Sequence, residues 1–222
     1  MDIFEQISTC VIRGKIKADS PYPPDMRGQD GVFELVRDAL EQGTNPNDVL
    51  TKGLMPGMNE VGKKFSRNEV FVPDLLMAAK AMTSGMDQLK PHFESGAAKR
   101  RGVFIVGTVK GDLHDIGKNL VRMMMEGAGY EVIDLGVDVS PQAFLEKVEE
   151  RPGSMVGLSA LLTTTMVNME ETTRLVKAKN PDTIVMVGGA PLTQEFCDKI
   201  GADAYSPDPQ GIIDWLDTKG AR

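Results

Sequence analysis

The apolar positions in the first part of the chain recur at the spacing of a helix. Ile3, Ile7 and Val11 are four residues apart, and the segment 32–40 repeats that interval. Each set therefore falls on one face of a helix. No alternation typical of strands interrupts this region. Residues 1–94 are predicted to form a small helical bundle with short loops.

The pattern changes after a stretch of polar and small residues over 95–101, which is predicted to be a linker. Residues 102–107 form a short apolar run that ends in glycine, which is typical of a buried parallel strand. Strand and helix patterns then alternate five times, which predicts right-handed βαβ units around one parallel sheet. We therefore expect a Rossmann-like or flavodoxin-like five-stranded parallel α/β domain over 102–222. Its strands are expected at 102–107, 130–135, 155–159, 183–187 and 203–205, and its helices at 115–127, 141–150, 164–179, 192–200 and 210–218.

Composition narrows the function classes. The chain has 222 residues, a formal net charge of −7, two histidines and two cysteines. So few histidines and cysteines argue against a zinc ribbon or an iron–sulfur protein. The negative charge argues against a nucleic-acid partner. No apolar run approaches the roughly 18 residues that a membrane span needs, so no membrane partner is expected.

The cysteines and the first residues bear on location. Cys10 and Cys197 are too few to form a disulfide framework, and we expect them to be buried thiols in a reducing compartment. Residues 1–6 include acidic side chains where a secretory signal has a basic segment. The sequence therefore predicts a cytoplasmic protein.

The loop after the first expected strand contains a glycine–lysine pair that suggests a phosphate loop at first sight. A phosphate loop needs four residues between its glycines and Ser or Thr after the lysine. Here five residues separate Gly111 from Gly117, and Asn119 follows Lys118. The dinucleotide-binding glycine pattern is also missing from this loop. Nucleoside triphosphate binding is therefore not predicted.

The same loop contains Asp112-x-His114, a carboxylate two residues before an imidazole. Ligands of such sheets bind beyond the carboxyl ends of the strands, where this loop lies. A carboxylate on one ring nitrogen fixes the tautomer of a histidine whose other nitrogen binds a metal. The pair can equally be an ordinary hydrogen-bonded loop histidine. The further ligands of a zinc site are absent, so a metal here would need a macrocycle to supply them.

Three motifs at the ends of three expected strands carry a family resemblance: Asp112-x-His114-x-x-Gly117, Ser159-x-Leu161 and Gly188-Gly189. Together they resemble the signature of cobalamin-binding domains, and above all the cobalamin-binding region of cobalamin-dependent methionine synthase. The helical half from Gly57 to Pro91 resembles the cap domain of that enzyme. In length and layout, the chain is most similar to the stand-alone corrinoid proteins of methyltransferase systems.

The resemblance implies roles for single residues. It makes His114 the lower axial ligand of cobalt, Asp112 its hydrogen-bond partner and Thr165 the third member of that relay. It makes Asp115, Ile116 and Gly117 the next residues of the cofactor-binding loop. The residues implied to form the slot for the displaced nucleotide tail are Ser159, Leu161, Thr163, Gly188 and Gly189, and those implied to cover the methyl face of the corrin are Phe65 and Val72.

The resemblance also implies a function. The chain is expected to accept a methyl group on cob(I)alamin and to hand it on from methylcobalamin, without being catalytic alone. The donor would be a methylamine, methanol, a quaternary amine or an aryl methyl ether, presented by a substrate-specific corrinoid methyltransferase. A second methyltransferase would pass the methyl group to tetrahydrofolate or coenzyme M, and a reductive activase would restore the cofactor. The alternatives are a cobalamin-dependent sensor or regulator and the small subunit of an adenosylcobalamin mutase.

Overall fold

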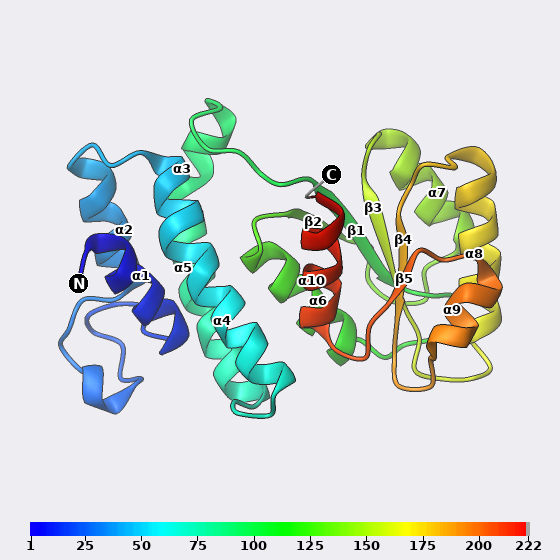
Figure 1. Ribbon diagram of the computed structural model, residues 1–222, viewed down its shortest axis with the longest axis horizontal. Coiled ribbons are helices and arrows are strands. Elements are labelled where there is room, and N and C mark those ends of the chain that lie inside the picture. Colours follow the sequence, from blue (N-terminus) through cyan, green and yellow to red (C-terminus); the bar gives the residue numbers. More distant parts are fainter. Residues whose placement is uncertain (221–222) are drawn as a thin grey trace. The chain divides into compact units, whose positions relative to one another are not determined.

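The computed structural model describes residues 1–220 and divides into two compact units. The first, the helical unit, contains Met1–Arg101 together with Gly127–Gly129. The second, the sheet unit, contains Gly102–Glu126 and the chain from Tyr130 onward. The expected fold class is confirmed: helices come first, and a five-stranded parallel α/β unit follows (Figure 1).

The helical unit packs around one apolar core. Ile7, Val11, Val32 and Val36 are fully buried, as their helical spacing predicts. Helix α1 packs against α4, and α2 packs against α5. The elements are α1 (Ile3–Ile12), η1 (Pro24–Met26), α2 (Val32–Glu41), α3 (Pro46–Asp48), η2 (Val49–Leu54), α4 (Met55–Ser66) and α5 (Val72–Glu94).

The sheet unit has the strand order β2-β1-β3-β4-β5, and all neighbouring pairs are parallel. Helices α6 and α10 cover one face of the sheet, and α7, α8 and α9 cover the other (Figure 1). The elements are β1 (Val103–Thr108), α6 (Ile116–Gly127), β2 (Glu131–Asp134), α7 (Pro141–Glu150), β3 (Met155–Ser159), α8 (Met166–Lys179), β4 (Val185–Gly188), α9 (Gln194–Ile200), β5 (Ala204–Tyr205) and α10 (Pro209–Gly220).

The topology determines where a ligand can bind. The order of connections reverses between β1 and β3, and ligands of this fold bind at that switch point beyond the carboxyl ends of the strands. In the register of the central strands, Thr108 pairs with Ser159, and Ser159 pairs with Gly188. The ends of β1, β3 and β4 are therefore adjacent, and the three loops that carry the predicted motifs meet at one edge of the sheet.

Close packing explains some of the glycines in the strands. A Cβ at Gly157 would lie 2.4 Å from the ring of Phe104, and one at Gly107 would lie 2.7 Å from the ring of Phe144. Both phenylalanines are fully buried. A larger residue at either of these two positions would displace a core aromatic ring, which is costly in a densely packed interior.

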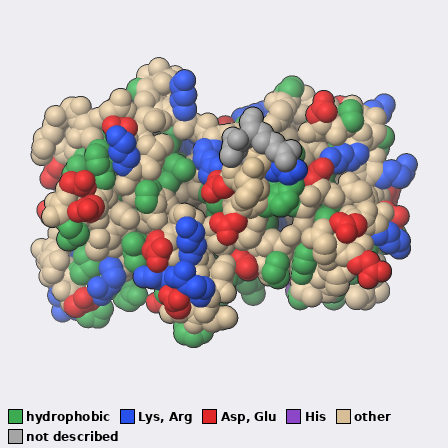
Figure 2. Space-filling model, viewed as in Figure 1, with side chains coloured by type: hydrophobic (Ala, Val, Ile, Leu, Met, Phe, Trp, Pro, Cys, Tyr) green, Lys and Arg blue, Asp and Glu red, His purple; other side chains and the backbone are tan. Residues whose placement is uncertain are grey.

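The surface carries charges of both signs. Figure 2 shows acidic and basic side chains interspersed on the face that it displays. Among the helices of residues 1–220, not one combines the length and the apolar character that crossing a membrane requires.

Candidate functional site

The loop between β1 and α6 begins with a tight turn that a neighbouring loop holds in place. Gly111 has φ +82°, a left-handed conformation that glycine adopts without steric cost. Its N–H donates to Asp138 Oδ1 at 2.7 Å, and the N–H of Asp138 donates to the carbonyl of Asp112 at 3.0 Å. The segment after β2 thus fixes the backbone just before the predicted histidine ligand.

Asp112 is the centre of the polar network. Its side chain is completely buried, and Oδ1 accepts both the backbone N–H of His114 at 3.1 Å and the ring Nδ1 of His114 at 2.8 Å. The other oxygen, Oδ2, faces the loop after β3. It accepts the N–H groups of Leu161 and Leu162 at 2.8 and 3.2 Å and the Thr165 hydroxyl at 2.8 Å.

This network keeps the carboxyl of Asp112 ionised. Burial alone would raise the pKa of Asp112, but the hydrogen bonds from Leu161 N–H, the Thr165 hydroxyl and His114 outweigh it and hold the pKa below its ordinary value. The Thr165 hydroxyl also lies 2.9 Å from the carbonyl of Leu162. A hydroxyl has one proton to donate, and an ionised carboxylate is the stronger acceptor.

The backbone and the ring Nδ1 of His114 are hydrogen-bonded, but part of its ring is exposed. Its carbonyl accepts the Thr108 hydroxyl at 2.8 Å, and its N–H and Nδ1 both engage Asp112. Half of its side chain is nevertheless exposed. A proton on Nδ1 shared with Asp112 leaves Nε2 as the ring nitrogen that can bind a metal.

The surroundings of His114 are apolar and open. Leu113 and Ile116, on either side of it in sequence, are 71% and 73% exposed. Leu161 and Leu162, whose N–H groups bind Asp112, are 41% and 42% exposed. Several large apolar side chains exposed around one half-exposed imidazole indicate a binding surface rather than ordinary solvent-facing loops.

The predicted glycines differ in what surrounds them. A Cβ at Gly117 would meet no atom within 4 Å, and one at Gly188 would approach only the Ser206 carbonyl at 4.0 Å. Gly189 has φ +142°, and a Cβ there would lie 1.8 Å from the carbonyl oxygen of Ala160. Gly117 and Gly188 therefore leave space open, whereas the packing of the protein itself requires Gly189.

The other predicted residues of the sheet unit lie on the same edge. Ser159 ends β3, and its carbonyl accepts the N–H of Val109 at 3.0 Å. Thr163 is exposed in the loop that follows. Asp115 is exposed and accepts a hydrogen bond from Asn119 at 3.0 Å, one turn into α6.

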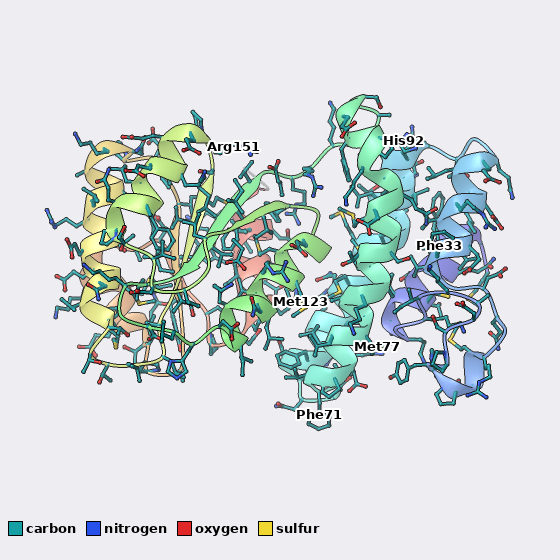
Figure 3. The ribbon with its side chains drawn as sticks, turned by 180° about the vertical axis from the view of Figure 1, so that it is seen from behind. Phe33, Phe71, Met77, His92, Met123 and Arg151 are labelled. Carbon is teal, nitrogen blue, oxygen red and sulfur yellow. The ribbon has the colours of Figure 1, made fainter. Side chains whose placement is uncertain are left out.

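The two predicted cap residues, Phe65 and Val72, belong to the helical unit. Phe65 is half-buried near the end of α4, and Val72 begins α5 with 36% of its surface exposed. Beside Val72, Phe71 is 67% exposed at the tip of the α4–α5 hairpin (Figure 3). Phe71 was not predicted, although two apolar residues, Phe71 and Val72, at the start of a helix are a signal along the chain.

Three further residues of the sheet unit were missed. Thr108 is a polar residue that ends an otherwise apolar strand, a signal that was available. Leu162 contributes its backbone N–H, and Asp138 contributes through a left-handed φ of 55°. Neither of these two contributions depends on a pattern that is visible along the chain.

The donor set also limits what kind of metal group fits. Within residues 1–220, no group of three or more His, Cys, Asp or Glu side chains could hold a metal ion. A metal bound at His114 must therefore bring its other ligands with it, as the four corrin nitrogens of cobalamin do. The open space at Gly117 and Gly188 and the exposed leucines suit a large, partly apolar group of that kind.

Family models match both units. A model described as B12 binding domain matches residues 102–210, and a second with the same description matches residues 29–90. Among characterised relatives, dimethylamine corrinoid protein 3 of Methanosarcina acetivorans is 45% identical over 80% of this chain and 84% of its own length. Trimethylamine corrinoid protein of Methanosarcina barkeri is 46% identical over 78% of this chain and 81% of its own length.

Solved structures agree with this assignment. A cobalamin-binding protein from Desulfitobacterium hafniense is 30% identical, with a TM-score of 0.76, and the match covers 98% of both chains. The methanol:cobalamin methyltransferase complex MtaBC from Methanosarcina barkeri has a TM-score of 0.81 at 28% identity, over 99% of this chain and 80% of that one. The chain belongs to the family of corrinoid proteins of methyltransferase systems, and its cofactor is cobalamin.

Proposed function

We propose that this protein carries methyl groups from a methylated amine to a second methyltransferase. The single observation that carries the proposal is the half-exposed His114 imidazole, whose Nδ1 is bonded to Asp112, so that Nε2 is the ring nitrogen left to bind a metal. The relatives named above support the amine as donor class, since they are corrinoid proteins for dimethylamine and trimethylamine. The resemblance to the methanol complex is weaker in sequence, at 28% identity.

In this proposal His114 is the lower axial ligand. When bound, cobalamin supplies a cobalt ion with four corrin nitrogens and an upper position that can carry a methyl group. The Asp112 carboxylate fixes the ring orientation and keeps the proton on Nδ1, so that Nε2 presents its lone pair. Thr165 donates to the far oxygen of Asp112 at 2.8 Å and completes the relay.

The remaining predicted residues surround the cofactor in this proposal. Asp115, Ile116 and Gly117 follow His114 and would contact the cofactor. The residues proposed to line the slot for the nucleotide tail are Ser159, Leu161, Thr163, Gly188 and Gly189. Gly188 contributes by leaving space open, and Gly189 contributes by letting the loop after β4 pass close to Ala160.

The helical unit has the role of a cap in this proposal. Phe65 and Val72 cover the methyl face of the corrin and shield it from water between transfers. The exposed Phe71, adjacent to Val72, extends that apolar surface. Residues 1–94 serve as the cap and 95–101 as the linker, because α5 ends at Glu94 and the sheet unit begins at Gly102.

The proposal includes three partner proteins. The first is the methyltransferase that presents the amine, and the second passes the methyl group to tetrahydrofolate or coenzyme M. The third is a reductive activase, which returns oxidised cobalt to the state that accepts a methyl group. We place the protein in the cytoplasm, which suits its two buried free thiols, Cys10 and Cys197.

The test is methyl transfer followed by absorption spectroscopy. The protein is loaded with cobalamin, reduced chemically and mixed in parallel reactions with dimethylamine, trimethylamine, monomethylamine or methanol. Each reaction contains the methyltransferase that is specific for its substrate. Formation of the methylated cofactor from an amine, but not from methanol, is the expected result. Methyl iodide, which needs no partner protein, serves as the positive control for a competent cofactor.

Two outcomes would overturn the proposal. Methylation from methanol alone would assign a different donor class. A cofactor that stays bound but never accepts a methyl group, even from methyl iodide, would point to the sensor class. The His114→Ala variant is expected to retain cobalamin more weakly and to lose the nitrogen coupling in the electron paramagnetic resonance spectrum of its Co(II) form.

A further inference from the structure

We infer that Thr108 is a positioning residue for the axial histidine, acting through the backbone of His114 rather than through its ring. The inference rests on the proposed function, because it assumes that His114 binds cobalt. Thr108 lies outside the three motifs of the family signature. It is the last residue of β1, and its hydroxyl donates to the carbonyl of His114 at 2.8 Å.

Thr108 is itself fixed at the end of β1 by the segment that follows β2. Its N–H donates to the carbonyl of Gly136 at 2.9 Å, and its carbonyl accepts the N–H of Val139 at 2.9 Å. The side chain is completely buried, so water cannot replace the hydroxyl as a donor. The bond from Thr108 therefore connects His114 directly to the end of β1, a central strand of the sheet.

The chain around His114 offers little other support. Leu113, Asp115, Ile116 and Gly117 are all exposed. In the described part of the chain, the hydrogen bonds that hold His114 are its two bonds to Asp112 and the one from Thr108.

The two anchors act on different degrees of freedom. The Asp112 carboxylate binds the N–H and the ring Nδ1 of His114, so it fixes the ring orientation and the peptide plane that precedes His114. The Thr108 hydroxyl binds the carbonyl, so it sets the peptide plane that follows His114. Without that bond the peptide plane can rotate, and the Cα–Cβ direction changes with it. A catalytic or binding group that shifts by about an ångström loses much of its effect.

The loss is expected to appear in metal coordination. Partners that orient a metal ligand without touching the metal typically change affinity by about 10- to 100-fold when they are removed. We therefore expect Thr108→Val to weaken cobalamin binding at least tenfold. We also expect it to lower the fraction of cofactor that is coordinated by histidine.

A matched control exists in α8. Thr172 is also completely buried, and its hydroxyl also donates to a backbone carbonyl, that of Asn168, at 2.6 Å. Thr172→Val and Thr108→Val therefore each remove one hydrogen bond from a buried hydroxyl to a backbone carbonyl, with the same change of side chain. The bond of Thr172 lies within α8. They differ in that only Thr108 is bonded to His114.

The experiment measures the Co(II) form of the cobalamin-loaded full chain by electron paramagnetic resonance. Wild type, Thr172→Val and Thr108→Ser, which retains the hydroxyl, are expected to show nitrogen coupling from histidine. Thr108→Val is expected to show a reduced or absent coupling, together with weaker binding in a cobalamin titration. If Thr108→Val does not fold, Thr108→Ala compared with Thr108→Ser isolates the hydroxyl in the same way.

The outcomes separate the role of Thr108 from that of His114. If Thr108→Val, or Thr108→Ala, shows the same nitrogen coupling and the same cobalamin affinity as wild type, the role of Thr108 is overturned. Equal loss in Thr108→Val and Thr172→Val would assign the effect to general destabilisation and would also overturn it. Absence of nitrogen coupling in wild type would instead overturn the axial role of His114 in the proposed function.

Discussion

Two regions expose large apolar side chains, and they are built on different principles. In the sheet unit, the segment Leu113–Gly117 leads from the loop after β1 into the first turn of α6 and exposes Leu113 and Ile116. In the helical unit, the tip formed by Phe71–Leu76 begins α5 and exposes Phe71, Val72 and Leu76. Exposed apolar surface of this kind is typical of binding sites, and we propose a binding role for both surfaces.

The segment of the sheet unit is held by buried polar bonds. Asp112, completely buried, joins the backbone of His114 to the loop after β3. The tip of the helical unit depends on helix formation and on exposed charges. Asp74 accepts the N–H of Phe71 at 3.0 Å, and Arg67 pairs with Glu69 at 2.6 Å on the surface. A loop that must aim one side chain needs buried hydrogen bonds, whereas a helical surface that only covers a ligand does not.

The largest expected effect comes from removing the buried carboxylate. Asp112→Ala leaves the N–H groups of Leu161 and Leu162 and the Thr165 hydroxyl without their acceptor, and should lower the free energy of unfolding by about 3 kcal/mol. Urea denaturation measures it. Glu69→Ala, which removes an exposed ion pair, should leave the midpoint unchanged. Similar midpoints for the two variants would abolish the distinction between the regions.

The next effect separates two neighbouring glycines. Gly189→Ala should destabilise the protein by about 2–4 kcal/mol, because its Cβ would lie 1.8 Å from the Ala160 carbonyl and its φ is left-handed. Gly188→Leu should leave the unfolding midpoint nearly unchanged yet block cobalamin uptake, since the side chain enters open space. Urea denaturation and cobalamin titration together test this. If Gly188→Leu still binds cobalamin with wild-type affinity, Gly188 does not line the proposed slot for the nucleotide tail.

A third effect uses pH. Burial raises the pKa of the Cys10 thiol to about 11, above its ordinary value of 9.0. The folded state therefore favours the protonated thiol, and this stabilisation is complete below pH 9 and is lost as pH rises through 11. Wild type should lose up to about 2–3 kcal/mol of stability over that range. Cys10→Ala should show a flatter profile in urea denaturation at pH 8 to 11, and parallel profiles would argue against a buried neutral thiol.

The smallest effect compares the two apolar surfaces themselves. Phe71→Ser and Leu113→Ser should each change the free energy of unfolding by no more than about 0.5 kcal/mol, because both side chains are mostly exposed. Leu113→Ser should in addition weaken cobalamin binding severalfold, since Leu113 adjoins His114. Thermal unfolding measures the change in stability, and a cobalamin titration measures the change in affinity. A large loss of stability in either variant would show that its side chain packs in the core.

The regular elements could be predicted closely from the sequence. Helix 141–150 and strand 155–159 were predicted with the bounds that the structure has. Amphipathic spacing, a serine N-cap with proline in the first turn, and a short buried apolar run are local signals that suffice for such elements. The short edge strand near 204 also fell where it was expected.

One element could not be predicted from local pattern. Helix α4 is preceded by a π-helical segment, Val49–Leu54, and the N–H of Met55 bonds to the carbonyl of Leu50. The wider spacing of π-helical bonds leaves no simple periodic trace in side-chain polarity. Packing of this segment against α1 stabilises a geometry that propensity alone does not favour.

By itself, the sequence determined the fold class, and it predicted the edge of the sheet where a ligand binds and the three loops that form it. Parallel strands and their loops follow from hydrophobic period and turn residues, which are local properties. The resemblance implied that Asp112 links His114 to Thr165, which lies 53 positions after Asp112. Only the tertiary structure decided that the N–H groups of Leu161 and Leu162 bind the same carboxylate and that Thr108 holds the carbonyl of His114. Such hydrogen bonds connect residues that are close in space but share no pattern along the chain, so the sequence does not predict them and the folded structure is needed to find them.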